Sequence, residues 1–361
     1  MPDPVTLEDL GGWPGVFGRL ARRSDLSAEE AAAALAEVLA GEASPAQIAA
    51  FAFGLRCKGE TVEEMRGLVR AMLAAAEPVQ LPAAVRERAV DTCGTGGDQS
   101  GTINVSTIAA VVVAGAGVPV CKHGGRAASS LAGSADVLES LGVAVSLGPV
   151  GVSRCVEEAG IGFCFAPRYH AAMRHAIPVR RELGVPTAFN FVGPLANPAR
   201  IARQVVGVGD PAMAPTMLGV LTGNGATDVA VVHGAGGLDE LSTTGVSTLL
   251  TTRGEQQVHP SEVGLRTAGL EDLRGGDAAA NAAAALRVLA GERGPHRDIV
   301  VLNAAAGLVV GGVADDLGAG VMLAAEAIDS GAAQGALDRL VRLSREEAAR
   351  EGAPLAGSGP G

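Results

Sequence analysis

The stretch Asp91–Thr107, DTCGTGGDQSGTINVST, combines the features that predict an α/β fold. It follows a short apolar segment, residues 88–93, that is typical of a buried strand, and it leads into an apolar helical pattern that begins at Ser106. Between them lie four glycines, whose missing side chains let a ligand approach the backbone closely. Because bare N–H groups at a helix N-terminus favour an anion, the stretch predicts an anion-binding loop.

Two well-known nucleotide-binding patterns do not fit this loop. No Gly-Lys-Ser/Thr triplet follows the glycines, and Gln99 stands where a GxGxxG pattern requires its third glycine. What remains is the general strand–loop–helix arrangement, with Ser106 and Thr107 as helix caps that also offer hydroxyl groups. The alternative is an ordinary surface loop built from turn-forming glycines.

A second loop of similar character follows the next strand candidate, residues 118–124. Lys122 and Arg126 bracket two glycines there, and Ser129 and Ser130 follow. Open α/β sheets bind ligands at the carboxyl ends of their strands, and cations beside N–H groups suit a polyanion with several phosphate groups. The alternative is a solvated turn with incidental charge.

Two adjacent carboxylates, Asp239 and Glu240, follow a further strand candidate, residues 228–234. On a loop, adjacent carboxylates can converge on a hard cation, and Mg²⁺ takes one or two carboxylates together with substrate phosphate oxygens. The alternative is an acidic first turn that complements a helix dipole.

The first 80 residues predict a small helical bundle. Three segments begin with a hydroxyl N-cap, at Ser27, Ser44 and Thr61. Glu30 completes a capping box, and Pro45 occupies a first helical position. We expect residues 1–80 to form a helical domain, joined by a basic helical segment around residues 170–195.

The pattern then changes to alternating strands and helices. The strands expected are residues 88–93, 118–124, 160–167, 203–209, 228–234 and 298–307, and two helices are expected at 106–117 and 134–143. Because apolar residues are nearly continuous in these strands, we expect a mostly parallel sheet covered on both faces, in a larger α/β domain of residues 85–345. Residues 346–361 are expected to form a disordered tail.

The composition excludes several classes of function. A formal net charge of −11 argues against nucleic acid as a partner, because phosphate backbones attract clustered Lys and Arg. The N-terminal residues lack the pattern of a signal peptide, and the longest apolar run, residues 108–121, is too short to span a membrane. Five scattered cysteines without a CxxC pair indicate small, buried, reduced side chains and a cytoplasmic location.

These motifs, taken together, resemble the anthranilate phosphoribosyltransferase family. The resemblance rests on GTGGD (94–98), TINVST (102–107), KHGGRAASS (122–130), GSADVLESLG (133–142), GLDELS (237–242) and the basic segment 166–199. It implies a helical domain and an α/β domain of the nucleoside phosphorylase/phosphoribosyltransferase type, paired as a homodimer. It also implies transfer of phosphoribose from phosphoribosyl pyrophosphate (PRPP) to the amine of anthranilate, with release of pyrophosphate, in tryptophan biosynthesis.

The same resemblance implies the residues of the site. Those implied to bind PRPP are Gly94, Gly97, Asp98, Thr102, Asn104, Val105, Ser106, Thr107, Lys122, His123, Gly124, Gly125, Arg126, Ala127, Ala128, Ser129, Ser130 and Ser134. Those implied to hold Mg²⁺ are Ser106, Asp239 and Glu240. Those implied to contact anthranilate are Gly94, Gly125 and Arg180, with His123 and Tyr169 nearby.

We expect positioning and electrostatics to dominate the chemistry, because cations, N–H groups and Mg²⁺ stabilise a leaving pyrophosphate. No residue is assigned a catalytic role. His123 remains open as a proton acceptor or as a structural residue. His170 and His175 are interpreted as surface residues, and Arg181 as facing solvent.

One position departs from the family pattern, since Gly125 replaces the asparagine of Lys-His-Gly-Asn-Arg. The change removes hydrogen bonds worth about 0.5–1.5 kcal/mol each and leaves a larger, more flexible loop. We prefer a working anthranilate enzyme with a relaxed pocket over a relative that acts on a modified aromatic amine. Two further alternatives are a pyrimidine nucleoside phosphorylase, which needs no Mg²⁺ pair, and an idle homologue that only binds ligands.

Overall fold

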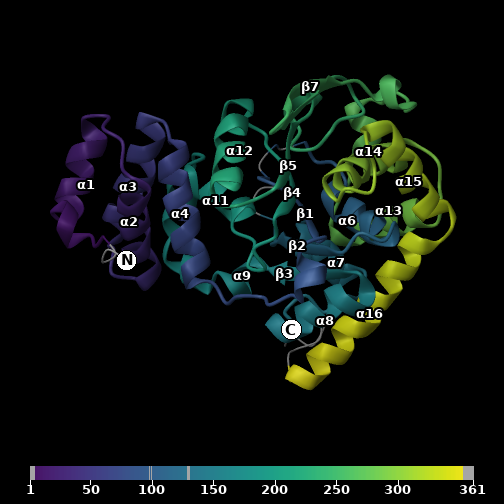
Figure 1. Cartoon of the computed structure of the whole chain (residues 1–361), viewed down its shortest axis with the longest axis horizontal. Coiled ribbons are helices and arrows are strands. Elements are labelled where there is room, and N and C mark those ends of the chain that lie inside the picture. The colour runs from purple at the N-terminus through teal and green to yellow at the C-terminus, as the bar shows by residue number, and fades with distance from the viewer. Residues whose placement is uncertain (1–4, 97, 99, 128–130, 353–361) are drawn as a thin grey trace.

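The computed structural model describes residues 5–96, 98, 100–127 and 131–352. Figure 1 shows a group of helices at the N-terminal end of the chain, beside a larger part built on a central sheet. We call the helices within residues 12–75 the helical domain, and the sheet with its covering helices the α/β domain. Among the described residues, no helix is long and apolar enough to cross a membrane.

Three helices of the helical domain begin where the sequence predicts. Its elements are η1 (Glu8–Leu10), α1 (Gly12–Ala21), α2 (Ala28–Ala40), α3 (Pro45–Lys58) and α4 (Val62–Ala75), and α5 (Ala83–Arg86) follows. The hydroxyl groups of Ser27, Ser44 and Thr61 each accept a hydrogen bond from the backbone N–H of the residue three positions later. The side chain of that later residue in turn accepts the backbone N–H of the N-cap residue. These capping boxes fix the start of α2, α3 and α4 from local sequence alone.

A seven-stranded sheet forms the centre of the α/β domain within the described residues (Figure 1). Its strands are β1 (Val90–Gly94), β2 (Val120–Gly124), β3 (Ile161–Phe165), β4 (Arg203–Gly207), β5 (Asp228–His233), β6 (Ser247–Thr251) and β7 (Gly254–Val258). The spatial order is β3-β2-β1-β4-β5-β6-β7, with β1–β5 parallel and β6 and β7 antiparallel at one edge. The predicted mostly parallel sheet is confirmed.

Helices cover the sheet and link its strands. They are α6 (Val105–Gly115), α7 (Ser134–Ser140), α8 (Pro149–Ala159), α9 (Ala166–Tyr169), η2 (Ala171–His175), α10 (Ile177–Leu183), α11 (Ala188–Leu195), η3 (Pro211–Met213), α12 (Ala214–Gly223), η4 (Ala235–Gly237), η5 (Pro260–Val263), η6 (Leu270–Leu273), α13 (Ala278–Leu289), α14 (Pro295–Val310), α15 (Leu317–Asp329) and α16 (Ala332–Glu351).

One apolar core lies on each face of the sheet. In β4, Val205 belongs to the core that contains residues of α6, α14 and α16, whereas Val206 belongs to the core that contains residues of α4, α11 and α12. The alternation follows from the two faces of a strand. Met173, Val179 and Phe189 lie in the same core as the helical domain, so the chain from η2 to α11 packs with that domain.

The structure corrects two expectations about secondary structure. Residues 298–307 lie within α14, not in a strand; the helix starts at Pro295 and is buried on nearly every side, which gives it the apolar continuity of a buried strand. Helix α16 continues to Glu351, past the expected start of a tail at residue 346, and Glu347 pairs with Arg154 and Arg350. Residues 353–361 of the expected tail lie outside the described residues.

The cysteines follow the sequence interpretation with one exception. All five are free, and four of them are buried, but Cys57 is exposed. Cys57 lies near the end of α3, on its solvent side.

Candidate active site

The two glycine-rich loops and the acidic pair start from the same edge of the sheet. Strands β1, β2, β4 and β5 are parallel, so the segments that follow them all leave from carboxyl ends. The loop after β1 is also hydrogen-bonded to β4, the neighbouring strand in the sheet, since the Thr95 N–H donates to the Gly207 carbonyl at 2.9 Å. This edge therefore gathers the motifs that the sequence singles out.

Asp239 and Glu240 each accept a hydrogen bond from the first loop. The Gly96 N–H donates to Oδ2 of Asp239 at 2.6 Å, and the Ser106 N–H donates to Oε1 of Glu240 at 3.0 Å. A Cβ at Gly94 would lie 2.3 Å from the same Asp239 oxygen, so only glycine fits there without displacing the carboxylate. The pair lies on a loop after η4, which excludes its interpretation as the first turn of a helix.

The acidic pair lacks sufficient compensating charge. Burial raises the pKa of Asp239 to about 6, and the nearby Asp98 adds to the shift. Burial also raises the pKa of Glu240 to about 8, with a further contribution from Asp239. Within the described part of the chain, there is no group of three or more His, Cys, Asp or Glu side chains that could hold a metal ion. A carboxylate pair of this kind fits Mg²⁺, which takes its other ligands from phosphate oxygens and water.

Lys122 lies beneath the first loop, with only 2% of its surface exposed. Its ammonium group donates to the Thr92 carbonyl and lies 3.5 Å from Ser106 Oγ. Burial raises the pKa of both Asp91 and Glu240, and the charge of Lys122 opposes this rise because it favours their ionised forms. Lys122 therefore supplies positive charge to the site from within the sheet.

Arg126 is exposed, but its charge is already paired. The guanidinium bonds Asp136 and Glu139, both at 2.6 Å, and lies 5.4 Å from the centre of the Phe165 ring. The bonds to these acids raise the pKa of Arg126 above its ordinary value. In this structure Arg126 fixes the second loop to α7, and its contact with a ligand stays a prediction.

Other predicted ligand-binding residues lie on or beside the same loops. The Asn104 amide donates to the Ala132 carbonyl at 3.1 Å. Asn104 Oδ1 and Thr107 Oγ1 are buried with no hydrogen-bond partner among the described residues, and such groups call for a ligand or an ordered water. Gly97, Ala128, Ser129 and Ser130 lie outside the described residues.

Arg180 lies on α10, in the segment that packs with the helical domain. It is half-buried, its guanidinium has no partner among the described residues, and burial lowers its pKa. A partly buried, unpaired guanidinium suits a carboxylate ligand. Arg181 is exposed.

Two histidines from distant parts of the chain meet next to the second loop. The rings of His123 and His170 lie edge to face, with their centres 5.1 Å apart. His170 is 5% exposed and its Nε2 lies 3.0 Å from the Ala196 carbonyl, so its interpretation as a surface residue is wrong. Burial lowers the pKa of His170 to about 4 and that of His123 well below its usual value, so both rings are neutral at pH 7. Tyr169 is buried and donates to the Leu147 carbonyl, which is a structural contact.

Position 125 has room for a side chain. Among the described residues, a Cβ at Gly125 would meet only the Cβ of Ala166, at an ordinary contact distance of 3.8 Å. Its φ lies outside the left-handed region, so the backbone does not require glycine there. A Cβ therefore fits at position 125 without a clash among the described residues.

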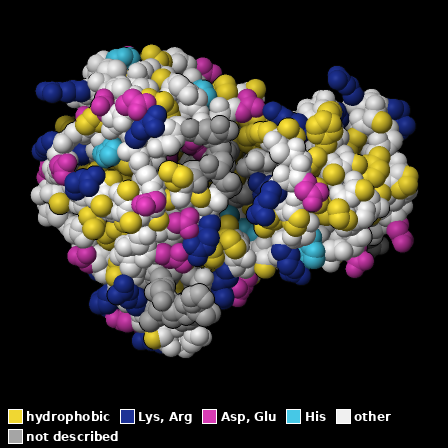
Figure 2. All heavy atoms as spheres, turned by 180° about the vertical axis from the view of Figure 1, so that it is seen from behind, with side chains coloured by type: hydrophobic (Ala, Val, Ile, Leu, Met, Phe, Trp, Pro, Cys, Tyr) yellow, Lys and Arg dark blue, Asp and Glu magenta, His cyan; other side chains and the backbone are white. Residues whose placement is uncertain are grey.

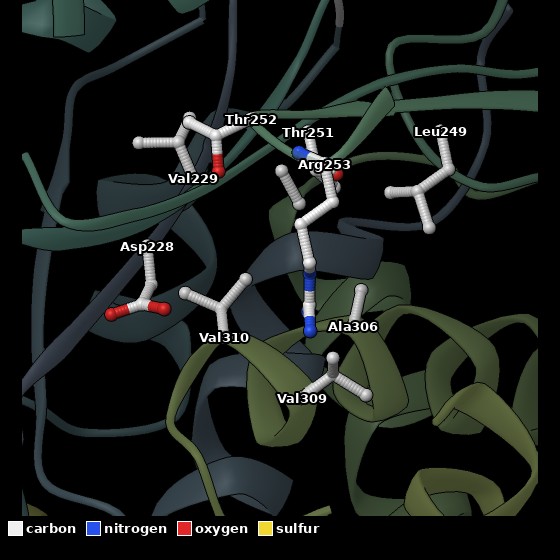
Figure 3. Close-up of a pocket in the computed structure, with 10 residues that line it drawn as sticks. Asp228, Val229, Leu249, Thr251, Thr252, Arg253, Ala306, Val309 and Val310 are labelled. Atoms are coloured by element: carbon white, nitrogen blue, oxygen red, sulfur yellow. Dashed lines mark hydrogen bonds between the residues drawn. The ribbon is translucent and has the colours of Figure 1, made fainter. Parts of the chain in front are cut away.

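The cavity shown in Figure 3 does not belong to this site. Its volume is about 50 Å³, and it lies between the start of β5, the turn after β6 and the end of α14. Asp228, Arg253 and Val310 are among its lining residues (Figure 3). Because Asp228 begins β5, the cavity lies toward the opposite edge of the sheet from the glycine loops.

Two family models match the chain. The model described as "Glycosyl transferase family, a/b domain" matches residues 86–334, and the one described as "Glycosyl transferase family, helical bundle domain" matches residues 15–76. The anthranilate phosphoribosyltransferase of Saccharopolyspora erythraea is 51% identical over 345 residues, which cover 93% of this chain and 97% of that protein.

Solved structures give the same result. The anthranilate phosphoribosyltransferase (TrpD) of Thermus thermophilus superposes with a TM-score of 0.87 at 44% identity, covering 91% of this chain and 99% of that chain. The anthranilate phosphoribosyltransferase of Saccharomyces cerevisiae in complex with PRPP and Mg has a TM-score of 0.86 at 27% identity, covering 92% and 98% of the two chains.

Proposed function

This chain belongs to the anthranilate phosphoribosyltransferase family, and we propose that it transfers the phosphoribosyl group of PRPP to the amine of anthranilate in tryptophan biosynthesis. The products are N-(5-phosphoribosyl)anthranilate and pyrophosphate. The observation that carries the proposal is the convergence of Asp239 and Glu240 on the first glycine loop, with hydrogen bonds to Gly96 and Ser106.

PRPP binds, in this proposal, across the carboxyl edge of the sheet. The loops after β1 and β2 offer backbone N–H groups to its phosphates, and the buried ammonium group of Lys122, bonded to the Thr92 carbonyl, contributes a positive charge. Asn104 Oδ1 and Thr107 Oγ1, which lack partners among the described residues, support a polar ligand at this place. The loop residues assigned from the sequence, among them Asp98, Thr102 and Ser134, complete the contact.

Mg²⁺ is the metal that the acidic pair fits best. Asp239 and Glu240 would hold it, with Ser106 as a third oxygen ligand and the diphosphate of PRPP supplying the rest. When bound, Mg²⁺ neutralises negative charge that develops on the leaving pyrophosphate. The raised pKa values of both carboxyl groups support a need for such a cation.

Anthranilate binds, in this proposal, between the α/β domain and α10. Arg180 would hold its carboxylate, and Gly94 and Gly125 would line the path to the sugar. His123 and His170 are neutral at pH 7 and packed against one another, which favours a role in shaping the pocket. The rate then depends on holding the amine in line with the ribose carbon and on stabilising the leaving group.

The space at Gly125 favours a second, wider acceptor range. A Cβ at this position would have the Cβ of Ala166 as its nearest neighbour among the described residues, at 3.8 Å, so we expect the missing side chain to admit ring-substituted 2-aminobenzoates that an asparagine would exclude. A pyrimidine nucleoside phosphorylase, by contrast, has no use for the Asp239–Glu240 pair, and this pair disfavours that alternative.

We also propose that the chain acts as a homodimer joined through the helical domain. Phe53 on α3 is 48% exposed, and Leu10 and Phe17 of the same domain are only partly buried. Figure 2 shows hydrophobic side chains over much of the visible surface of the helical domain. Apolar surface of this kind marks a contact between proteins.

The test is to follow anthranilate fluorescence in the presence of PRPP, with Mg²⁺ and then with a chelator. We expect fluorescence to fall only when PRPP and Mg²⁺ are both present. Substituted anthranilates in the same assay report the acceptor range. Phosphorolysis of thymidine or uridine without metal, and no consumption of anthranilate, would overturn the proposal in favour of the phosphorylase.

A further inference from the structure

Asp91 is a buried carboxylate that the proposed chemistry does not use. It lies in β1 with 0% of its surface exposed. Its Oδ1 accepts the backbone N–H of His123 at 3.0 Å, and its Oδ2 accepts the side-chain amides of Asn197 at 2.8 Å and Gln204 at 3.3 Å. Donors from three separate segments of the chain therefore converge on one side chain.

Two of these donors hold the chain where it returns from the helical domain. Asn197 follows α11, and its amide also donates to the Cys121 carbonyl at 2.8 Å, while its Oδ1 accepts the Ala199 N–H at 2.9 Å. The Gln204 amide donates to the Pro194 carbonyl at 2.7 Å. The connection from α11 to β4 is thus attached to the sheet at several points.

The third donor, the backbone N–H of His123, connects Asp91 to the start of the segment that ends at Asn197. His123 binds Asp91 through its backbone N–H, and its ring packs on the ring of His170. His170 in turn lies 3.0 Å from the Ala196 carbonyl through its Nε2. Both ends of residues 170–197, which include Arg180, are therefore linked through short contacts to the Asp91 carboxylate.

We propose that Asp91 is a positioning residue that holds the segment bearing Arg180 in register with the glycine loops of the sheet. The proposal rests on the proposed function, because it assumes that anthranilate lies between these two parts. Asp91 acts through His123, Asn197 and Gln204, and touches neither substrate.

A carboxylate suits this position because each of its hydrogen-bond partners is a donor. An asparagine at position 91 would turn an NH₂ group toward one of these donors, and at least one donor would lose its acceptor. Burial raises the pKa of Asp91 to about 6, while the charge of Lys122 and the bonds from Asn197 and His123 oppose the shift. The carboxylate is therefore ionised above pH 7 and able to hold all three donors.

The test compares Asp91→Asn with the unaltered full-length enzyme, with anthranilate and PRPP varied separately. We expect the KM for anthranilate to rise about tenfold while the KM for PRPP stays within about twofold. Asn197→Ala is expected to give the same split. The double variant is expected to be no worse than Asp91→Asn alone, because residues that act as one unit are not additive.

Glu64→Gln is the control, since Glu64 is also 0% exposed and accepts hydrogen bonds from the Leu26 and Thr61 N–H groups, but lies inside the helical domain, where it also pairs with Lys58 at 2.9 Å. It is expected to lower thermal stability and leave both KM values unchanged. Equal changes in both KM values for Asp91→Asn, or lower stability with no change in either, would overturn the proposal. If Asp91→Asn does not fold, the split in Asn197→Ala decides, and loss of folding in both would also overturn it. A wild-type enzyme that leaves anthranilate unconsumed would instead overturn the proposed function and this proposal with it.

Discussion

Arg180 is a partly buried cation whose guanidinium has no partner among the described residues. We expect Arg180→Ala to raise the KM for anthranilate far more than the KM for PRPP. Charge-assisted hydrogen bonds contribute roughly 1.5–3 kcal/mol, which corresponds to about 10–150-fold in binding. Initial-rate kinetics check this, with the exposed Arg181→Ala as the control. Equal changes in the KM values of the two substrates would show that Arg180 does not bind anthranilate specifically.

Asp239 and Glu240 repel one another when no cation is bound. We expect the double variant Asp239→Asn, Glu240→Gln to lose Mg²⁺-dependent turnover while remaining folded. Because their pKa values are raised to about 6 and about 8, stability falls as the pH rises from their ordinary values of 3.8 and 4.5 through these raised values, so neutral amides are expected to keep or raise the Tm of the metal-free protein at pH 8.5. Turnover and thermal melting measure the two effects. A normal rate in the variant would exclude the pair as metal ligands.

Gly125 lies where a Cβ would meet no clash among the described residues, and its backbone conformation does not require glycine. We expect Gly125→Asn to lower the KM for anthranilate by about 2–10-fold, because one added hydrogen bond contributes about 0.5–1.5 kcal/mol. The same variant is expected to exclude ring-substituted anthranilates that the wild type accepts. Rates with a series of acceptors test both effects. An unchanged KM with an unchanged acceptor range would place this position away from anthranilate.

Single residues differ in how well the sequence predicts them. The glycine loops and the acidic pair form compact motifs, and the structure brings Gly96, Ser106, Asp239 and Glu240 together as the motifs suggest. Asp91 and Asn197 are separated by 106 positions, and no local pattern indicates that they meet. For the same reason the burial of His170 against His123 was not predictable.

At the level of elements, the start of α2 depends on a capping box. The Ser27 hydroxyl accepts a hydrogen bond from the Glu30 N–H, and the Glu30 carboxylate accepts one from the Ser27 N–H. We expect Ser27→Ala to lower the free energy of unfolding by about 1 kcal/mol. Urea denaturation measures the loss. Ser330→Ala is the control, because Ser330 is an exposed residue after α15 whose hydroxyl makes no hydrogen bond among the described residues. Equal losses in the two variants would contradict the capping argument.

Elements whose signals are local were predicted well, and those that depend on their neighbours were not. The helix over residues 298–307 has the same apolar continuity as a buried strand, so periodicity alone could not distinguish the two. Strand β7, GEQQV, is polar and mostly exposed, and it forms a strand because it pairs with β6 at the edge of the sheet. Neither feature can be read from a short window of sequence.

For the whole molecule, the half-exposed Phe53 on α3 provides a test of assembly. We expect Phe53→Glu to convert a dimer into monomers, because a charge on an apolar contact surface must be desolvated without a partner. Light scattering coupled to size-exclusion chromatography measures the mass. Met322→Glu is the control, because Met322 is 69% exposed on α15 in the α/β domain. A wild-type protein that is monomeric, or a variant that remains dimeric, would contradict an interface at Phe53.

The core shared by α4, α11, α12 and the sheet limits how the chain can be recombined with its relatives. The boundary suggested by the order of the sequence, near residue 76, cuts through this core, because residues 173–221 supply much of its other side. A chimera that imports a foreign N-terminal bundle must therefore also import the residues from η2 to α12 that pack against it. Transplanting the first segment alone would join surfaces that did not evolve together.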